Sequence, residues 1–243
     1  SRIATVISLG ARIDGNNYSS SQSNPLEQFS PRLAITKNLN EHFSINASAG
    51  IFYQMPTYTI LGYKNNEGNF VNKDVKYIRN QQAVAGLEYI TDNNARITLE
   101  GYYKIYANYP FNLVDSISIA NEGSDFGVVG DVPVDNRSKG RSYGIELLIQ
   151  QKLYKDFYAL LAYTYGTSEF TNLNNSYTAS SSDFRHTLSF TAGKVFKKNW
   201  EAGIKFRMSS GAPHTPNDLE ATALKSNWDI TGQAVRDYNR INS

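Results

Sequence analysis

The sequence has no cysteine and no strong excess of charge of either sign. Its formal net charge is only +2 over 243 residues, and the basic residues are scattered along the chain. Without cysteine, the chain can form neither a disulfide framework nor a thiolate metal site. Because no basic arm is present, the sequence does not predict nucleic-acid binding.

Long apolar runs are also missing. No stretch of about 18 apolar residues occurs, which excludes a transmembrane helix. The mean hydropathy of -0.45 is typical of a soluble protein. It is also compatible with a membrane β-barrel, because each lipid-facing residue there alternates with a polar one.

Signatures of catalysis and of metal binding are absent as well. The sequence has no G-x-S-x-G, P-loop or H-E-x-x-H motif. Its three histidines, at positions 42, 186 and 214, have no metal-ligand spacing. Residues 14–17 and 65–68 carry oxygen ligands, but ordinary Asn/Gly turns explain them better than calcium. We therefore predict that the protein is not an enzyme and holds no metal or cofactor.

The most informative segment is residues 95–109, A-R-I-T-L-E-G-Y-Y-K-I-Y-A-N-Y. Side chains alternate faces along a strand. One face then carries Arg96, Thr98, Glu100, Tyr102, Lys104 and Tyr106, and the other carries Ile97, Leu99, Gly101, Tyr103, Ile105 and Ala107. The pattern is about twice as long as a usual globular strand. It matches the roughly 9–11 residues that a tilted strand needs to cross a bilayer.

Similar two-faced segments recur along the chain. We expect nine long strands at about 2–13, 31–38, 42–54, 79–90, 95–109, 140–153, 157–170, 183–196 and 200–210. Short polar connectors alternate with long loops, as in a membrane barrel with one short-turn rim and one long-loop rim. Aromatic residues lie near both ends of the strands, with Ile, Leu and Ala between them, which indicates two membrane interfaces.

Several ordered motifs resemble a known family. They include F-S-P-R-L-A at 29–34, E-G-Y-Y-K-I-Y at 100–106, G-R-S-Y-G-I-E at 140–146, D-F-R-H at 183–186 and G-A-P-H-T-P at 211–216. In this order they resemble the barrel of TonB-dependent outer-membrane receptors, especially those of Bacteroidetes. The resemblance implies an outer-membrane location in a Gram-negative bacterium and a 22-stranded barrel filled by a plug domain.

The resemblance also sets the expected fold class and domain. We expect an all-β antiparallel meander of about nine long strands, forming part of that 22-stranded transmembrane β-barrel. Residues 1–243 are expected to be one partial barrel domain, because neither a plug, a TonB box nor the final strands of the family are recognised. We predict that the parent protein takes up a scarce ligand with TonB-coupled energy. That ligand would be a metal chelate, vitamin, glycan or peptide.

Ligand contacts are expected from the long loops and the upper lumen. The candidates are Tyr58, Tyr102, Lys104, Tyr106, Arg141, Arg185 and Arg207, since Arg and Tyr bind anionic or aromatic chelates. Packing against the plug is the competing explanation for each of them. The expected partners are the TonB complex through the plug, the lipid bilayer and the small ligand, with a surface lipoprotein left open.

Three other interpretations compete with this one. A passive porin or hydrophobic-solute channel would form a complete small barrel without a plug. An outer-membrane enzyme would need carboxylates or a Ser/His pair clustered at one rim, and no such cluster is recognised. A soluble β-sandwich binding module would have strands of about 5–6 residues and no lipid-facing band.

Overall fold

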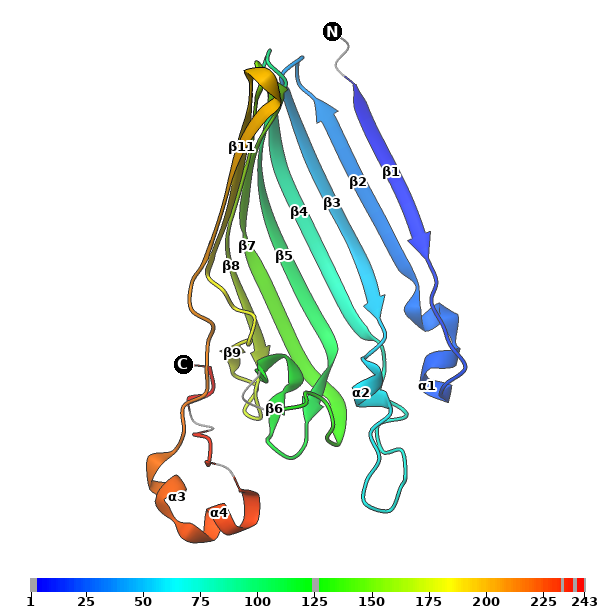
Figure 1. Cartoon of the computed structure of the whole chain (residues 1–243). Helices are drawn as coiled ribbons and strands as arrows, with labels where there is room; N and C mark the ends of the chain where they lie inside the picture. The colour runs from blue at the N-terminus through cyan, green and yellow to red at the C-terminus, as the bar shows by residue number, and fades with distance from the viewer. Residues whose placement is uncertain (1–3, 124–126, 233, 238–239, 243) are drawn as a thin grey trace.

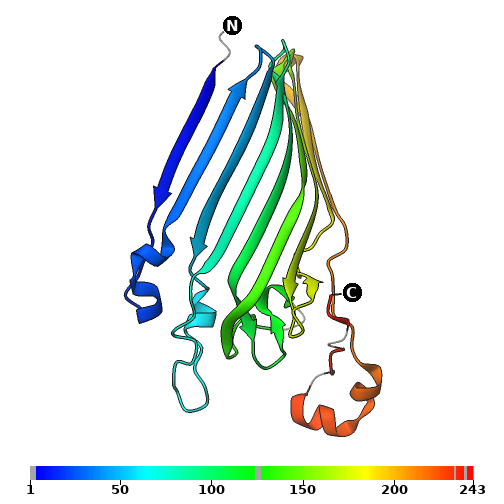
Figure 2. The same cartoon turned by 180° about the vertical axis from the view of Figure 1, so that it is seen from behind.

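The computed structural model describes residues 4–123, 127–232, 234–237 and 240–242. It shows a single curved β-sheet rather than two packed layers (Figures 1 and 2). Its long strands follow the order β1-β2-β3-β4-β5-β7-β8-β10-β11, and all neighbours are antiparallel. Within the described chain, β1 and β11 each pair on one side only.

The long strands confirm the predicted meander. They are β1 (Thr5–Arg12), β2 (Ser30–Asn38), β3 (Phe43–Gln54), β4 (Ile78–Ile90), β5 (Ala95–Asn112), β7 (Val134–Tyr154), β8 (Phe157–Thr171), β10 (His186–Phe196) and β11 (Trp200–Ser209). The longest has 21 residues. A soluble β-sandwich is therefore wrong on both strand length and layering.

Among the strand ends that the structure describes, three differ from the prediction by three residues or more. Strand β5 continues past Tyr109 to Asn112 and β7 starts at Val134, because the two strands stay paired beyond irregular registers near Tyr109. Strand β10 starts at His186 instead of residue 183, since Ser180 and Asp183 form a turn before it. Residues 2 and 3 of the first predicted strand lie outside the described residues.

The long loops contain small elements that alternation could not predict. These are α1 (Ser20–Ser23), η1 (Pro25–Gln28), α2 (Tyr58–Leu61), β6 (Ile117–Ser118), η2 (Ile119–Asn121), β9 (Tyr177–Ala179), α3 (Leu219–Ala223) and α4 (Lys225–Thr231). The short turns, including η4 (Lys197–Asn199), lie at the opposite end of the sheet (Figure 1). No helix in the described ranges has the length and apolar character needed to span a membrane.

The two faces of the sheet differ as the alternation predicts. We call the face that carries Thr98 the inner face and the face that carries Leu99 the outer face. Thr98 is 5% exposed, whereas Leu99 is 47% exposed. On the outer face, Leu87, Leu99 and Leu147 lie side by side on β4, β5 and β7.

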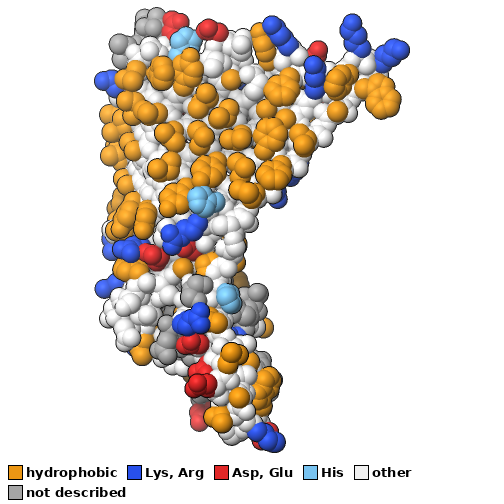
Figure 3. Space-filling model, turned by 90° about the vertical axis from the view of Figure 1, so that its left-hand side faces the viewer, with side chains coloured by type: hydrophobic (Ala, Val, Ile, Leu, Met, Phe, Trp, Pro, Cys, Tyr) orange, Lys and Arg blue, Asp and Glu red, His pale blue; other side chains and the backbone are white. Residues whose placement is uncertain are grey.

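Charged residues are confined to the margins of the outer face. Lys37 and Lys194 lie near the short-turn rim, and Arg79, Arg141 and Glu169 lie near the loop rim. Figure 3 shows hydrophobic side chains gathered in a broad band over this face, with basic side chains above and below it. Since charge at the bilayer midplane costs about 2–4 kcal/mol, this distribution fits a lipid-facing surface.

Glycines let large side chains lie flat on the inner face. Four register pairs place a glycine of one strand opposite a large inward side chain of its neighbour: Gly86 with Glu100, Gly144 with Tyr102, Gly140 with Phe170, and Gly193 with Tyr158. At each of these glycines, an added Cβ would overlap the facing side chain or the adjacent backbone. The inner wall is thus kept smooth by the pairing of small with large residues.

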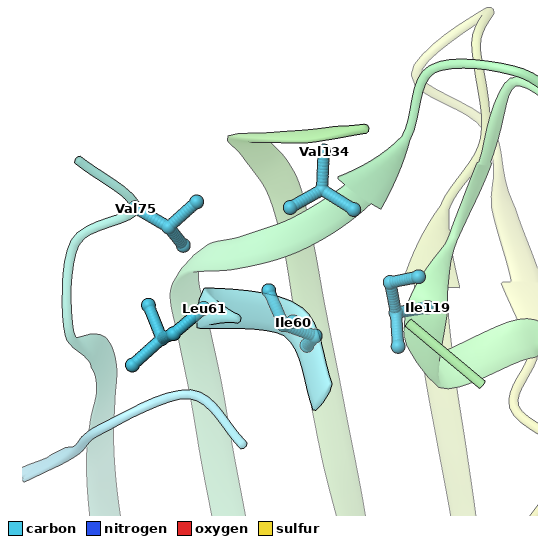
Figure 4. Packing of buried hydrophobic residues seen from close by; sticks show 5 residues of the cluster. All are labelled: Ile60, Leu61, Val75, Ile119 and Val134. Carbon is cyan, nitrogen blue, oxygen red and sulfur yellow. The ribbon is translucent and has the colours of Figure 1, made fainter. Parts of the chain in front are cut away.

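The loops have a hydrophobic core of their own. Ile60, Leu61, Val75, Ile119 and Val134, the first residue of β7, pack together at the loop end of the sheet (Figure 4). Asn72, 1% exposed, ties these loops together. Its Nδ2 donates to the carbonyls of Ile60 (2.9 Å) and Val132 (2.8 Å), and its Oδ1 accepts from the Val134 amide (2.9 Å). The loop rim is therefore an ordered structure that can hold a binding surface.

Candidate functional site

A pocket of about 1250 Å³ opens on the inner face where the strands meet the long loops. One register row of inward side chains forms part of its wall. The row runs from Phe52 through Asn80 to Tyr106, and continues across Gly140 to Phe170. All of these except Gly140 line the pocket.

The aromatic part of the wall is a cluster of three rings. The ring centroids of Tyr106 and Phe170 are 5.4 Å apart, and those of Tyr109 and Phe170 are 4.5 Å apart. Tyr106 meets Tyr109 edge to face at 6.3 Å. These separations lie in the range of favourable aromatic pairs. The cluster offers apolar ring surface next to phenolic hydroxyl groups, which suits a ligand with planar or apolar parts.

A polar network forms another side of the pocket and joins two loops. The Asn16 Nδ2 donates to the Gln22 Oε1 (2.9 Å) and to the Tyr77 hydroxyl (3.0 Å), and also contacts the Met55 sulfur at 3.2 Å. Gln22 is fully buried, and its Nε2 donates to the Val75 carbonyl (2.8 Å). This network fixes the loop after β1 against the loop after β3.

Three charged residues, Arg12, Asp14 and Glu122, complete the pocket wall near the loops. Arg12 lines the pocket and donates from Nε to the Asp14 Oδ1 at 2.8 Å, so its charge is paired within the pocket wall. Glu122 is only 6% exposed and accepts a hydrogen bond from the Asn112 Nδ2 at 2.7 Å.

Burial gives Glu122 an unusual titration. The pKa of Glu122 is raised to about 7; burial is the largest cause, and the nearby carboxylates of Asp115 and Asp131 act in the same direction. The hydrogen bond from Asn112 and the charge of Arg236 oppose this rise. The wall therefore changes its charge near neutral pH.

The structure brings together only some of the predicted site residues. Tyr106 lines the pocket. Tyr102 and Lys104 lie lower on the inner face of β5, with the Lys104 Nζ 4.9 Å from the Tyr102 ring centroid. Tyr58 begins α2 and is 79% exposed, and Arg207 lies on β11 at the sheet edge.

Two predicted lumen residues have a different position and are corrected. Arg141 pairs in register with Ile105 and Glu169, so it shares the outer face with Tyr143. Arg185 precedes the regular part of β10, where alternation no longer fixes its direction. It borders a groove lined by Tyr143, Ile145 and other outer-face residues.

Sequence reasoning missed Asn16, Tyr109, Glu122 and Phe170 as pocket residues. Phe170 stood at the end of a predicted strand, but only the register of three strands places it beside Tyr106. Asn16 lies in the segment weighed as a calcium loop, yet its side chain bonds to protein groups. The described residues contain no group of three or more His, Cys, Asp or Glu side chains suited to a metal ion.

Comparison with known proteins decides the family. The model for the family "TonB dependent receptor-like, beta-barrel" matches residues 5–242. The chain belongs to the TonB-dependent receptor family. Receptors of this family lie in the outer membrane of Gram-negative bacteria, and this location and the predicted family are confirmed. They are transporters, which also confirms the prediction that the chain is not an enzyme.

Solved structures show the same fold. The pyoverdine outer membrane receptor FpvA from Pseudomonas aeruginosa PAO1 matches with a TM-score of 0.60 and 14% identity, over 88% of this chain and 30% of that one. The ferric-catecholate import receptor Fiu from K12 E. coli matches with a TM-score of 0.57 and 12% identity, over 86% of this chain and 30% of that one. The copper transporter OprC matches with a TM-score of 0.54 and 16% identity, over 76% and 26%.

The chain thus spans about 30% or less of the length of these three structures. No curated protein matches the sequence. The narrower resemblance to receptors of Bacteroidetes stays a prediction.

Proposed function

We propose that this chain is part of the barrel wall of a receptor that imports a scarce ligand with energy supplied through TonB. The ligand class is a metal chelate, vitamin, glycan or peptide. Strands outside residues 1–243 would complete the barrel, for which the family suggests 22 strands, and a plug domain elsewhere in the protein would contact TonB. The proposal does not include a surface lipoprotein.

One observation carries this proposal most strongly. The inner-face pocket combines the Tyr106–Tyr109–Phe170 ring cluster with the polar Asn16 network, at the loop end of a barrel wall. Ligand sites are commonly apolar and aromatic hollows with a few placed polar groups. FpvA is a pyoverdine receptor, Fiu is a ferric-catecholate import receptor and OprC is a copper transporter, so metal-containing ligands are tested first.

The test measures uptake by cells that express the complete protein. Labelled ferric chelates, copper, vitamin B12, an oligosaccharide and a peptide are offered before and after the proton gradient is collapsed. We expect energy-dependent uptake of one ligand class, and about a tenfold loss with Tyr106→Ala. Tyr89→Ala is the matched control, because Tyr89 lies on the outer face beside Phe43, near the short turns.

Two results would contradict the proposal. Uptake that continues unchanged without the proton gradient would indicate a passive channel. Equal uptake by the Tyr106→Ala and Tyr89→Ala variants would show that the imported ligand does not bind in the pocket.

A further inference from the structure

A groove crosses the outer face of the sheet, away from the inner-face pocket. Its volume is about 820 Å³, within the range of about 300–1,000 Å³ typical of small-molecule sites. Small side chains form its floor. Ala47 is opposite Ala85, Ala49 is opposite Ala83, and Gly101 follows Ala85 across the sheet.

The groove rises toward the loop rim as it crosses the sheet from β2 to β8. On β2 it includes Ile35, three positions before the short-turn end at Asn38. On β8 it includes Tyr165, eight positions beyond the short-turn end at Phe157. The apolar floor therefore lies deep in the hydrophobic band, and the other end approaches the outer membrane surface.

The length of the groove suits one leaflet of a membrane. It spans six strands, and five steps of about 4.8 Å give roughly 24 Å. With a strand tilt of about 35–45°, the path covers roughly 15 Å in depth. This is about half of a hydrocarbon core that is roughly 30 Å thick.

Basic and aromatic side chains meet at the shallow end of the groove. Tyr143, Tyr165 and Arg185 line it directly. Arg141 lies just beyond the groove lining, with its guanidinium 4.3 Å from the Tyr177 ring centroid and 6.0 Å from that of Tyr143. Its Nε donates to the Glu169 Oε2 at 2.7 Å. Arg185 donates from Nε to the Asp183 Oδ2 at 3.0 Å and lies within electrostatic range of Glu169. The two arginines are thus held at one rim.

Each arginine retains donors for a ligand. Among the hydrogen bonds of the described residues, Arg141 and Arg185 use only Nε. Their side chains are 37% and 49% exposed. A guanidinium carries five N–H donors and binds phosphate through pairs of them. An apolar slot that ends at such donors matches an amphiphile with a phosphate head.

We propose that this groove binds a phosphate-bearing lipid of the outer leaflet. One acyl chain lies over the alanine floor, and the phosphate contacts Arg141 and Arg185. A second copy of this chain fits less well, because two facing alanine floors would leave the hollow unfilled. The proposal depends on the position of the sheet in the membrane and not on ligand import.

The test uses the complete protein, purified in detergent and stripped of lipid. Native mass spectrometry follows binding of dipalmitoyl phosphatidylglycerol, of dipalmitoylglycerol, which lacks the phosphate, and of inorganic phosphate. We expect a one-to-one phosphatidylglycerol complex at about tenfold lower concentration than dipalmitoylglycerol requires. Millimolar inorganic phosphate should not displace the lipid, because the alanine floor holds the chain.

Two variants test the two ends of the groove separately. Arg141→Gln removes donors at the rim, and Ala85→Leu fills the floor; each should weaken phosphatidylglycerol binding about tenfold. Arg207→Gln is the control, because Arg207 is on the inner face opposite Ser189. Heat-modifiable migration on gels verifies that each variant is folded.

Three results would contradict the proposed lipid site. Equal binding of the lipids with and without phosphate, or displacement by inorganic phosphate, would overturn the proposal. So would wild-type lipid binding by the folded Arg141→Gln and Ala85→Leu variants.

Discussion

Replacing Leu99 with arginine tests the membrane-facing assignment most directly. Leu99 is the fifth residue of β5, four positions from its short-turn end. Four steps of about 3.4 Å on a strand tilted by about 40° place it roughly 10 Å above that rim. Because the apolar band of such barrels is about 25 Å tall, Leu99 lies near its middle.

The expected cost follows from this depth. Arginine facing lipid near the midplane destabilises a barrel by about 2–4 kcal/mol. Since each 1.4 kcal/mol is a factor of ten, the folded population should fall about 30- to 700-fold relative to the unfolded one. The flanking outer residues Leu87 and Leu147 offer the new charge no partner in register.

Ser48→Arg is the matched control. Ser48 lies on the inner face of β3, is exposed, and pairs in register with Ala34 and Val84. An arginine there can extend into the lumen, so its effect should stay within about 0.5 kcal/mol. Thr98 would be a poorer control, because it is 5% exposed and a large side chain would overpack it.

The assay is urea titration of the complete protein folded into lipid vesicles, with heat-modifiable gel migration as the readout. Leu99→Arg should unfold at a clearly lower urea concentration than the wild type, and Ser48→Arg should follow the wild type. Equal midpoints for the two variants, or a lower midpoint for Ser48→Arg, would refute the assignment of the two faces.

Three further predictions concern packing, loops and pH. Gly140→Ala should cost about 1–3 kcal/mol in urea unfolding, because its Cβ would overlap Phe170. Gly101→Ala should change little, because the nearest atom to its Cβ would be the Gly144 carbonyl oxygen at 3.9 Å; equal effects of the two substitutions would contradict this packing. Asn72→Leu should speed hydrogen exchange in residues 57–75 and 132–134, because three buried hydrogen bonds are lost. Unchanged exchange would contradict the inference that Asn72 holds these two loops together. Burial raises the pKa of Glu122 to about 7, so the folded state binds the proton more tightly than the unfolded state does. As the pH rises from about 4.5 to 7, the stability of the 112–122 loop should therefore fall by on the order of 1–3 kcal/mol. Hydrogen exchange measures this change. Glu122→Gln should remove that pH dependence, and a wild-type pH profile in this variant would contradict the assignment.

Strand alternation predicted the sheet well because it is a local property. Within residues 95–109, each side chain has a face that follows from its position alone, and Thr98 and Leu99 differ in exposure as expected. Arg185 shows where this reasoning ends. Regular alternation starts only at His186, so the residue before it can point toward either side.

The loop rim could not be predicted from the sequence for a different reason. Asn72 bonds to Val132 and Val134, about 60 residues away, and Asn16 reaches Tyr77 over a similar separation. Such contacts depend on which strand ends lie side by side. The sequence around a polar loop residue does not indicate a distant partner. From the sequence alone, Asn72 therefore cannot be distinguished from other loop asparagines.

The inner wall shows the same limit at the level of residue pairs. Gly140 and Phe170 are both visible in the sequence, but their effect depends on the register that sets them opposite each other. A shift of two residues would keep both on the inner face and still separate them. Phe170 would then extend into the lumen instead of lying on Gly140, and its contacts with Tyr106 and Tyr109 would be lost. The shape of the candidate pocket is therefore set by pairing between strands, which explains why the barrel wall was predictable and the pocket was not.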